Sequence, residues 1–136
     1  MYCLQAVIVT ESARSRLLDA IEGARLVPLG QGLSLMPVTE TRFDTGPLAD
    51  CSEHGAVAYV EAEYFGGAGT QSAQVWEGGE TVLGPLHVDE DEPVPADGSP
   101  ISQALRRLGV LKGDHFDEFD AVGLGRHRYT DGWLSA

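Results

Sequence analysis

The middle of the chain constrains the fold more than any other part. Residues 56–65 alternate between small apolar side chains and larger or charged ones, which predicts a strand with two different faces. A glycine-rich turn at 66–69 follows. Residues 71–76 and 80–84 then flank a Gly-Gly dipeptide, which tolerates the positive φ of a tight hairpin turn. Successive strands joined by such turns pair antiparallel, so we expect a mainly antiparallel sheet.

Two further segments predict helices. Thr10 can cap the first helix, whose apolar stripe ends at Gly23. The second helix follows Ser99, has Pro100 at its first position, and ends at Gly109 with the pattern of a Schellman motif. Strands and helices do not alternate regularly, which argues against a parallel sheet of strand–helix–strand units.

The remaining segments complete an α+β domain. We predict strands at 3–9, 25–29 and 32–38, a loop at 39–54, and a helical turn within 116–124. No repeat or linker divides the sequence, and its 136 residues match the size of one ordinary domain. We therefore predict a single domain over residues 1–136, with two main helices packed on one face of a mainly antiparallel sheet.

Net charge narrows the range of partners. The chain has 21 acidic residues against nine Lys and Arg, a formal charge of −12. Binding to nucleic acid or to anionic membranes depends on neutralising phosphates, so we expect neither as a partner. The same charge fits a basic protein partner, whose approach it would steer, or serves solubility alone.

The N-terminus and the cysteines predict a cytoplasmic protein. The chain begins without a basic segment before its short apolar run, so no signal peptide is expected. No run approaches the roughly 18 apolar residues of a membrane span. Cys3 and Cys51 are too few for a disulfide framework and are expected to be reduced thiols.

Glu61 and Glu63 are the first candidate ligand-binding residues. Residues two apart on a strand point the same way, with Cα atoms roughly 6.5–7 Å apart. Two carboxylates so placed can bind a cation or divide the acid and base roles of catalysis. Alternatively, they form the ordinary solvent face of a half-buried strand.

The glycine-rich turn after this strand is the second candidate. Gly66, Gly67 and Gly69 allow backbone N–H groups to approach an anion closely, and Gln71 lies just beyond them. The Lys and the following helix of a phosphate-binding loop are missing from the sequence. We interpret the segment as a tight turn beside a binding groove.

Arg126 and His127, followed by Arg128, form the densest positive patch in this acidic chain. Two interpretations remain open. The patch either binds a carboxylate or phosphate through bidentate hydrogen bonds, or pairs internally with the acidic residues at 89–92 or 114–120.

Neither a metal centre nor a catalytic set is predicted. His115 and the acidic residues after it have the right ligand types, but Phe116 and Phe119 interrupt them, so we expect an acidic helix start. No Gly-x-Ser-x-Gly, His-x-x-Glu-His or Cys-x-x-Cys motif occurs, and the four His residues are scattered. We therefore expect no cofactor, and we lean away from an enzyme.

Three segments resemble a family of small uncharacterised bacterial proteins. They are Glu63 through Gln71, which carries a Tyr-Phe-Gly-Gly-x-Gly-x-Gln motif, Ser99 through Val110, and Asp117 through Gly125. The resemblance covers about residues 56–134 and implies one continuous domain. It implies no reaction, because none is established for the family. Some small acidic bacterial proteins of this kind neutralise toxins, a role that the resemblance allows.

The leading functional interpretation is a non-enzymatic protein-interaction domain, immunity-like or inhibitor-like, with an acidic surface. Tyr64, Trp76 and Trp133 are its candidate partner contacts, because aromatic residues carry much of the energy of interfaces. The alternative is a small-molecule-binding domain or an unrecognised enzyme, with a site where the 61–71 strand and turn meet Arg126. The sequence leaves the partner and the oligomeric state open.

The directions of four side chains distinguish these two interpretations. Convergence of Glu61, Glu63, Gln71 and Arg126 in one cleft favours ligand binding. Their dispersion favours a protein partner.

Overall fold

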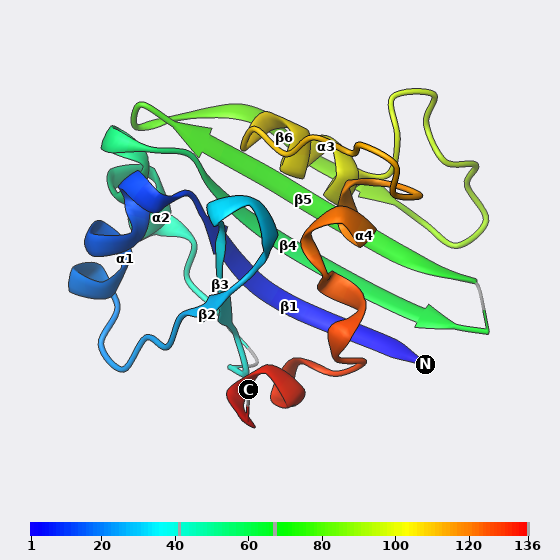
Figure 1. The fold of residues 1–136 in the computed structure, drawn as a ribbon, viewed down its shortest axis with the longest axis horizontal. Helices are drawn as coiled ribbons and strands as arrows, with labels where there is room; N and C mark the ends of the chain where they lie inside the picture. Colours follow the sequence, from blue (N-terminus) through cyan, green and yellow to red (C-terminus); the bar gives the residue numbers. More distant parts are fainter. Residues whose placement is uncertain (41, 67, 136) are drawn as a thin grey trace.

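The computed structural model describes residues 1–40, 42–66 and 68–135. Its centre is a six-stranded antiparallel sheet with the strand order β2-β3-β1-β4-β5-β6 (Figure 1). The strands are β1 (Tyr2–Val9), β2 (Val27–Pro28), β3 (Ser34–Pro37), β4 (Val57–Phe65), β5 (Ala68–Glu77) and β6 (Glu80–Val88). The α+β class and the mainly antiparallel sheet predicted from the sequence are confirmed.

Glycines shape both turns of the β4–β5–β6 meander. Gly78 and Gly79 have φ values of 64° and 84°, as a two-residue hairpin turn requires. Gly69 sits where the backbone of Glu63 leaves no room for a Cβ atom. Its role is therefore the close pairing of β4 with β5. Gly66 has a φ of 57° in the turn itself, and Gly67 lies outside the described residues.

The two predicted helices form near the expected positions, but Thr10 does not cap the first one, because its hydroxyl makes no capping bond and donates to the Ala56 carbonyl at 3.2 Å instead. They are α1 (Arg14–Ala20), preceded by a 3₁₀ turn over Glu11–Ala13, and α3 (Pro100–Arg107). The Ser99 hydroxyl accepts a hydrogen bond from the Ser102 N–H at 3.3 Å, and the Val110 N–H donates to the Leu105 carbonyl at 3.0 Å. These bonds confirm the predicted N-cap and Schellman ending of α3.

Two shorter helices complete the fold: α2 (Gly46–Cys51) and α4 (Glu118–Val122). The prediction of a loop over 39–54 is wrong at α2. This helix is less than two turns long and buries only Leu48 and Cys51, so its sequence carries too few periodic positions to identify it. The helical turn predicted within 116–124 corresponds to α4, which Gly123 ends with a φ of 85°.

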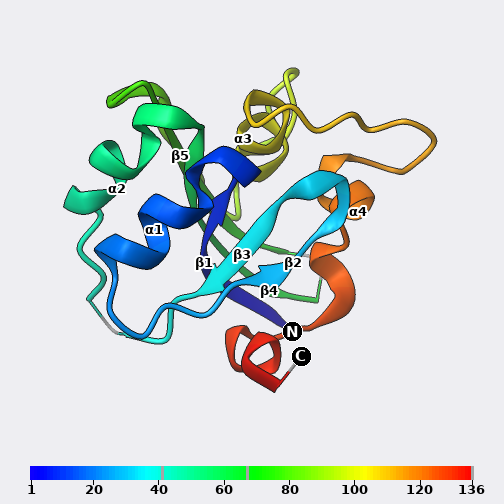
Figure 2. The same cartoon turned by 60° about the vertical axis from the view of Figure 1, so that its left-hand side comes forward.

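The sheet is covered on both faces, so the expectation that both main helices pack on one face is not confirmed. Leu17 of α1 and Leu48 of α2 pack with Val7, Val9 and Val57. On the other face, α3 and α4 pack with the side chains that alternate with these: Ala6, Ile8, Ala58 and Val60. Figure 2 shows the two helix pairs on opposite sides of the strands. Consecutive residues of β1, from Ala6 to Val9, are accordingly fully buried.

The C-terminal segment pairs with the part of β1 that β3 does not reach. The Cys3 N–H donates to the Arg128 carbonyl at 2.7 Å, and the Gln5 N–H donates to the Thr130 hydroxyl at 3.0 Å. Thr130 begins a 3₁₀ stretch over Thr130–Ser135. Within the described residues, no helix has the length and apolar character of a membrane span.

Candidate functional site

One end of the α1–α2 face of the sheet is left open. The helices cover the end that holds Val7, Val9 and Val57. Beyond that end, every second residue of each strand still points to this face, because side chains alternate along a strand. The side chains there are polar or acidic. Across β1, β4 and β5, the register places Cys3 beside Glu63 and Thr70, and Gln5 beside Glu61 and Ser72.

These residues line an open depression of about 420 Å³, which we call the polar groove. Its polar lining consists of Cys3, Gln5, Glu61, Glu63, Thr70, Ser72, His87 and Thr130. The predicted pair Glu61 and Glu63 is thus brought together on one exposed surface. Neither carboxylate has an ion-pair partner among the described residues, and no Lys or Arg is part of the groove lining.

A Ser–His–Asp chain lies at the β6 side of the polar groove. The Ser72 hydroxyl is 2.7 Å from His87 Nδ1, and His87 Nε2 is 2.6 Å from the Asp89 carboxylate. This chain was not predicted, because the sequence around Ser72 contains no nucleophile motif. A symmetrical Gly-Gly hairpin would place Ser72 opposite Pro85, but two register shifts in the β5–β6 pair bring His87 opposite it instead.

The surroundings of Ser72 do not suit a catalytic nucleophile. Ser72 pairs with Glu61 of β4 on one side and with His87 of β6 on the other, so it lies within the sheet and not beside a helix N-terminus that could stabilise an oxyanion. Glu61 lies directly opposite Ser72 on β4, and its carboxylate would repel a negative charge developing there. The three side chains therefore form a hydrogen-bonded polar ladder across the exposed sheet.

Aromatic side chains flank both ends of the polar groove. At one end, the Tyr59 hydroxyl accepts a hydrogen bond from Gln5 at 2.6 Å, and the Tyr59 ring stacks on Phe43 at 5.5 Å between centroids. Burial raises the pKa of Tyr59 above its ordinary value, so the hydroxyl stays neutral. At the other end, Phe65 and Tyr129, which pairs with Cys3, are both more than half exposed.

The other predicted ligand-binding residues do not converge on this groove. Gln71 lies on the opposite face and is buried under α3, where its side-chain oxygen accepts a hydrogen bond from the Ile101 N–H at 2.9 Å. Arg126 donates to the Pro28 carbonyl at 2.8 Å and lies over the Trp133 ring, 5.1 Å from its centroid. The His127 ring packs edge-on against the same indole. Arg126 therefore fixes the C-terminal segment to the body by hydrogen bonding and ring contact, with no acidic partner among the described residues.

The predicted partner-contact aromatics differ in exposure. Trp133 is fully buried and Trp76 is 7 % exposed, each within one of the two cores, so both rings serve packing. A large apolar residue near a chain end or a turn gives no signal of which face it takes, which is why the sequence did not reveal this. Tyr64 remains half-buried, on the α3 face.

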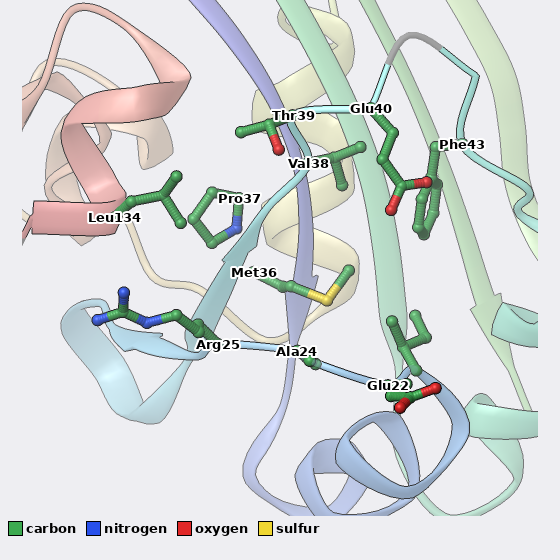
Figure 3. Close-up of a pocket in the computed structure, with 12 residues that line it drawn as sticks. Glu22, Ala24, Arg25, Met36, Pro37, Val38, Thr39, Glu40, Phe43 and Leu134 are labelled. Atoms are coloured by element: carbon green, nitrogen blue, oxygen red, sulfur yellow. The ribbon is translucent and has the colours of Figure 1, made fainter.

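A separate small pocket of about 140 Å³ lies beside β3 (Figure 3). Figure 3 shows Met36 near its centre, with Arg25 on one side and Glu40 and Phe43 on the other. It contains none of the residues predicted from the sequence. Its volume is well below the roughly 300 Å³ at which pockets begin to hold drug-sized ligands.

Among the described residues, no group of three or more His, Cys, Asp and Glu side chains is arranged to hold a metal ion. Both cysteines are free thiols; Cys51 is buried, which raises its pKa, and Cys3 is half-buried at the groove. No family model, curated protein or solved structure matches the chain.

Proposed function

We propose that this protein is a non-enzymatic interaction domain whose polar groove docks a basic segment of a partner protein. One observation carries the proposal: Glu61 and Glu63 stand side by side in an open groove, without ion-pair partners among the described residues. A chain with a charge of −12 would bring a positively charged partner to this surface by long-range attraction.

The anatomy of the groove supports a protein partner. Exposed aromatic rings at its rim, such as Phe65 and Tyr129, supply the apolar contact area that interfaces use, while the carboxylates supply specificity. Arginine suits such a site, because its planar guanidinium can bond a carboxylate in bidentate geometry and stack on an aromatic ring. The partner segment would therefore carry at least one arginine beside apolar side chains.

The dispersion of the predicted ligand-binding residues also favours this proposal over the alternative small-molecule site. Glu61 faces the polar groove, Gln71 faces α3, and Arg126 is engaged by Pro28 and Trp133. A joint site of these three residues has no support in this geometry. An immunity-like or inhibitor-like role follows if the partner's basic segment belongs to its own functional site.

Two double variants with equal loss of charge test the proposal. Glu61→Gln with Glu63→Gln removes the groove carboxylates, whereas Glu11→Gln with Asp19→Asn removes two exposed acids of the α1 segment. A short arginine-rich peptide with interspersed leucines is the probe, measured by calorimetry at physiological salt. We expect the groove variant to lose about tenfold or more in affinity and the control to lose much less. Equal losses would show that only net charge matters and would overturn the proposal.

A further inference from the structure

The α3 face carries a second depression, of about 480 Å³, which we call the α3 pocket. It lies where the start of α3 meets the end of β4, the start of β5 and the start of α4. Among its lining residues are Tyr64 of β4 and Gln71 of β5, Ser99 and Ser102 at the start of α3, and Asp117 with Glu118 at the start of α4.

The floor of the α3 pocket contains an oriented hydrogen-bond donor. Gln71 is 8 % exposed, and its side-chain oxygen accepts from the Ile101 N–H at 2.9 Å. Because a backbone N–H can only donate, this bond fixes which end of the amide is oxygen and which is nitrogen. The Nε2 amide then has no hydrogen-bond partner among the described residues. An amide held in place with its donors unused is a pre-organised contact for an acceptor.

Ser102 provides a second unused group beside it. Its side chain is almost fully buried, and its hydroxyl makes no hydrogen bond within the described structure. A buried polar group without a partner is unfavourable, and a bound acceptor would remove that penalty. Ser102 lies in the first turn of α3 and Gln71 contacts that turn from β5, so both unused groups are near the helix N-terminus, where the dipole favours negative charge. The floor is therefore built for a carboxylate.

The rim of the pocket carries both positively and negatively charged side chains. Arg106 is paired with Glu118 at 3.4 Å, so these two residues largely neutralise each other. Lys112 and Asp97 also line the pocket, and neither has an ion-pair partner among the described residues. A simple anion would meet repulsion from Asp97 and from Asp117, which also lines the pocket, whereas a molecule with one carboxylate and one ammonium group finds a partner for each.

The walls are apolar and open to solvent. Phe116 is 87 % exposed and Val94 is 66 % exposed, and both line the pocket together with the half-buried ring of Tyr64. Grouped apolar side chains on a surface indicate a binding site more than single ones do, and these three line the same depression. They can enclose an aromatic or branched side chain whose polar end lies on the floor.

From this arrangement we infer that the α3 pocket binds a free α-amino acid with an apolar side chain. Its carboxylate accepts hydrogen bonds from Gln71 Nε2 and the Ser102 hydroxyl, its ammonium group faces Asp97, and its side chain lies against Phe116. The inference does not depend on the polar groove, which lies on the other face of the sheet.

Calorimetric titration of the full chain with three related compounds tests the chemistry of the site. L-phenylalanine is the main probe, 3-phenylpropionate lacks its ammonium group, and phenylalanine amide lacks its carboxylate. We expect L-phenylalanine to bind, and each analogue to bind about tenfold or more weakly. Absence of L-phenylalanine binding at millimolar concentration, or equal binding of all three compounds, would overturn the inference.

Matched variants test the floor. Gln71→Glu keeps an oxygen for the Ile101 N–H but replaces the donor by a negative charge, so it should lower L-phenylalanine affinity about tenfold or more. Gln74→Glu makes the same change on the opposite face of β5 and should leave the affinity unchanged. Ser102→Ala should weaken binding while the folded protein melts at the same or a higher temperature, because a buried hydroxyl without a partner is removed. Equal affinity of the wild type and the Gln71→Glu variant would contradict the inference.

Discussion

The two faces of strand β4 differ in what their side chains do. On one face, Ala58, Val60 and Ala62 are buried under α3. On the other, Val57 is buried under α1 and α2, but Glu61 and Glu63 continue the row into open solvent. A single strand thus supplies the core with one set of alternate residues and an exposed polar surface with the other. Substitutions on the buried face should therefore affect stability, and substitutions at Glu61 and Glu63 should affect binding.

Truncation in the α3-side core should have the largest effect on stability. Leu105 is fully buried against the sheet, so Leu105→Ala removes packed atoms and leaves a cavity. We expect the free energy of unfolding to fall by about 2–5 kcal/mol, measured by denaturant titration. A loss below about 1 kcal/mol would mean that this face is not a tightly packed core.

A side chain added where β4 and β5 approach closely should have the next largest effect on stability. At Gly69 a Cβ atom would collide with the Glu63 backbone, so Gly69→Ala forces the strands apart and should cost about 1–3 kcal/mol. Gly66→Ala is the control in the same turn: it meets no neighbouring atom, and only its positive φ opposes it, at about 1 kcal/mol. Equal losses of stability in the two variants would show that the close approach of β4 and β5 does not explain why glycine is needed at position 69.

High pH should lower the stability of the protein through one tyrosine on each face of the sheet. Burial raises the pKa of Tyr2, which packs into the α3-side core, and of Tyr59, which borders the polar groove. Below about pH 10, the ordinary tyrosine pKa, their contribution to stability is complete. As the pH rises further, the unfolded chain releases protons that the folded state retains, and the free energy of unfolding falls.

Phenylalanine variants check this pH dependence. Tyr2→Phe and Tyr59→Phe should each make the fall in stability above pH 10 less steep, and Tyr2→Phe should have the larger effect because its pKa is raised further. Denaturation curves at several pH values measure the slopes. Parallel curves for the wild type and the Tyr2→Phe variant would contradict the assignment.

The smallest effect on stability is expected from the groove carboxylates. Glu61→Gln with Glu63→Gln should change the free energy of unfolding by less than about 0.5 kcal/mol, because both side chains are exposed and make no ion pair within the described residues. The same variant should strongly weaken peptide binding. A large loss of stability would assign the two residues a structural role instead.

Local patterns in the sequence identified most of the helices and strands, with α2 as an exception, but they identified less of how these elements are arranged. The capping residue Ser99 and the ending at Gly109 identify α3, and the alternation in β4 identifies both of its faces. The pairing of Ser72 with His87 could not be predicted, because it depends on bulges whose position the β5–β6 hairpin sequence does not specify.

The candidate site was predicted only in part, again because local geometry was readable in the sequence and distant contacts were not. Glu61 and Glu63 are two residues apart on one strand, so their common face follows from strand geometry alone. Gln71 was assigned to the same site from its closeness in sequence. Its true neighbours are Ile101 and the start of α3, thirty residues further along the chain. Contacts of that separation depend on how helices dock on the sheet, which a single sequence does not encode locally.

The most direct test of the docking proposal is the rate at which Cys3 is alkylated. Cys3 lines the polar groove, and the buried Cys51 serves as an internal reference of low reactivity. We expect a saturating arginine-rich peptide to slow alkylation of Cys3 in the wild type and to leave that of Cys51 unchanged. In the Glu61→Gln, Glu63→Gln variant, the peptide should protect Cys3 much less. Alkylation of Cys3 at the same rate with and without the bound peptide would contradict the docking proposal.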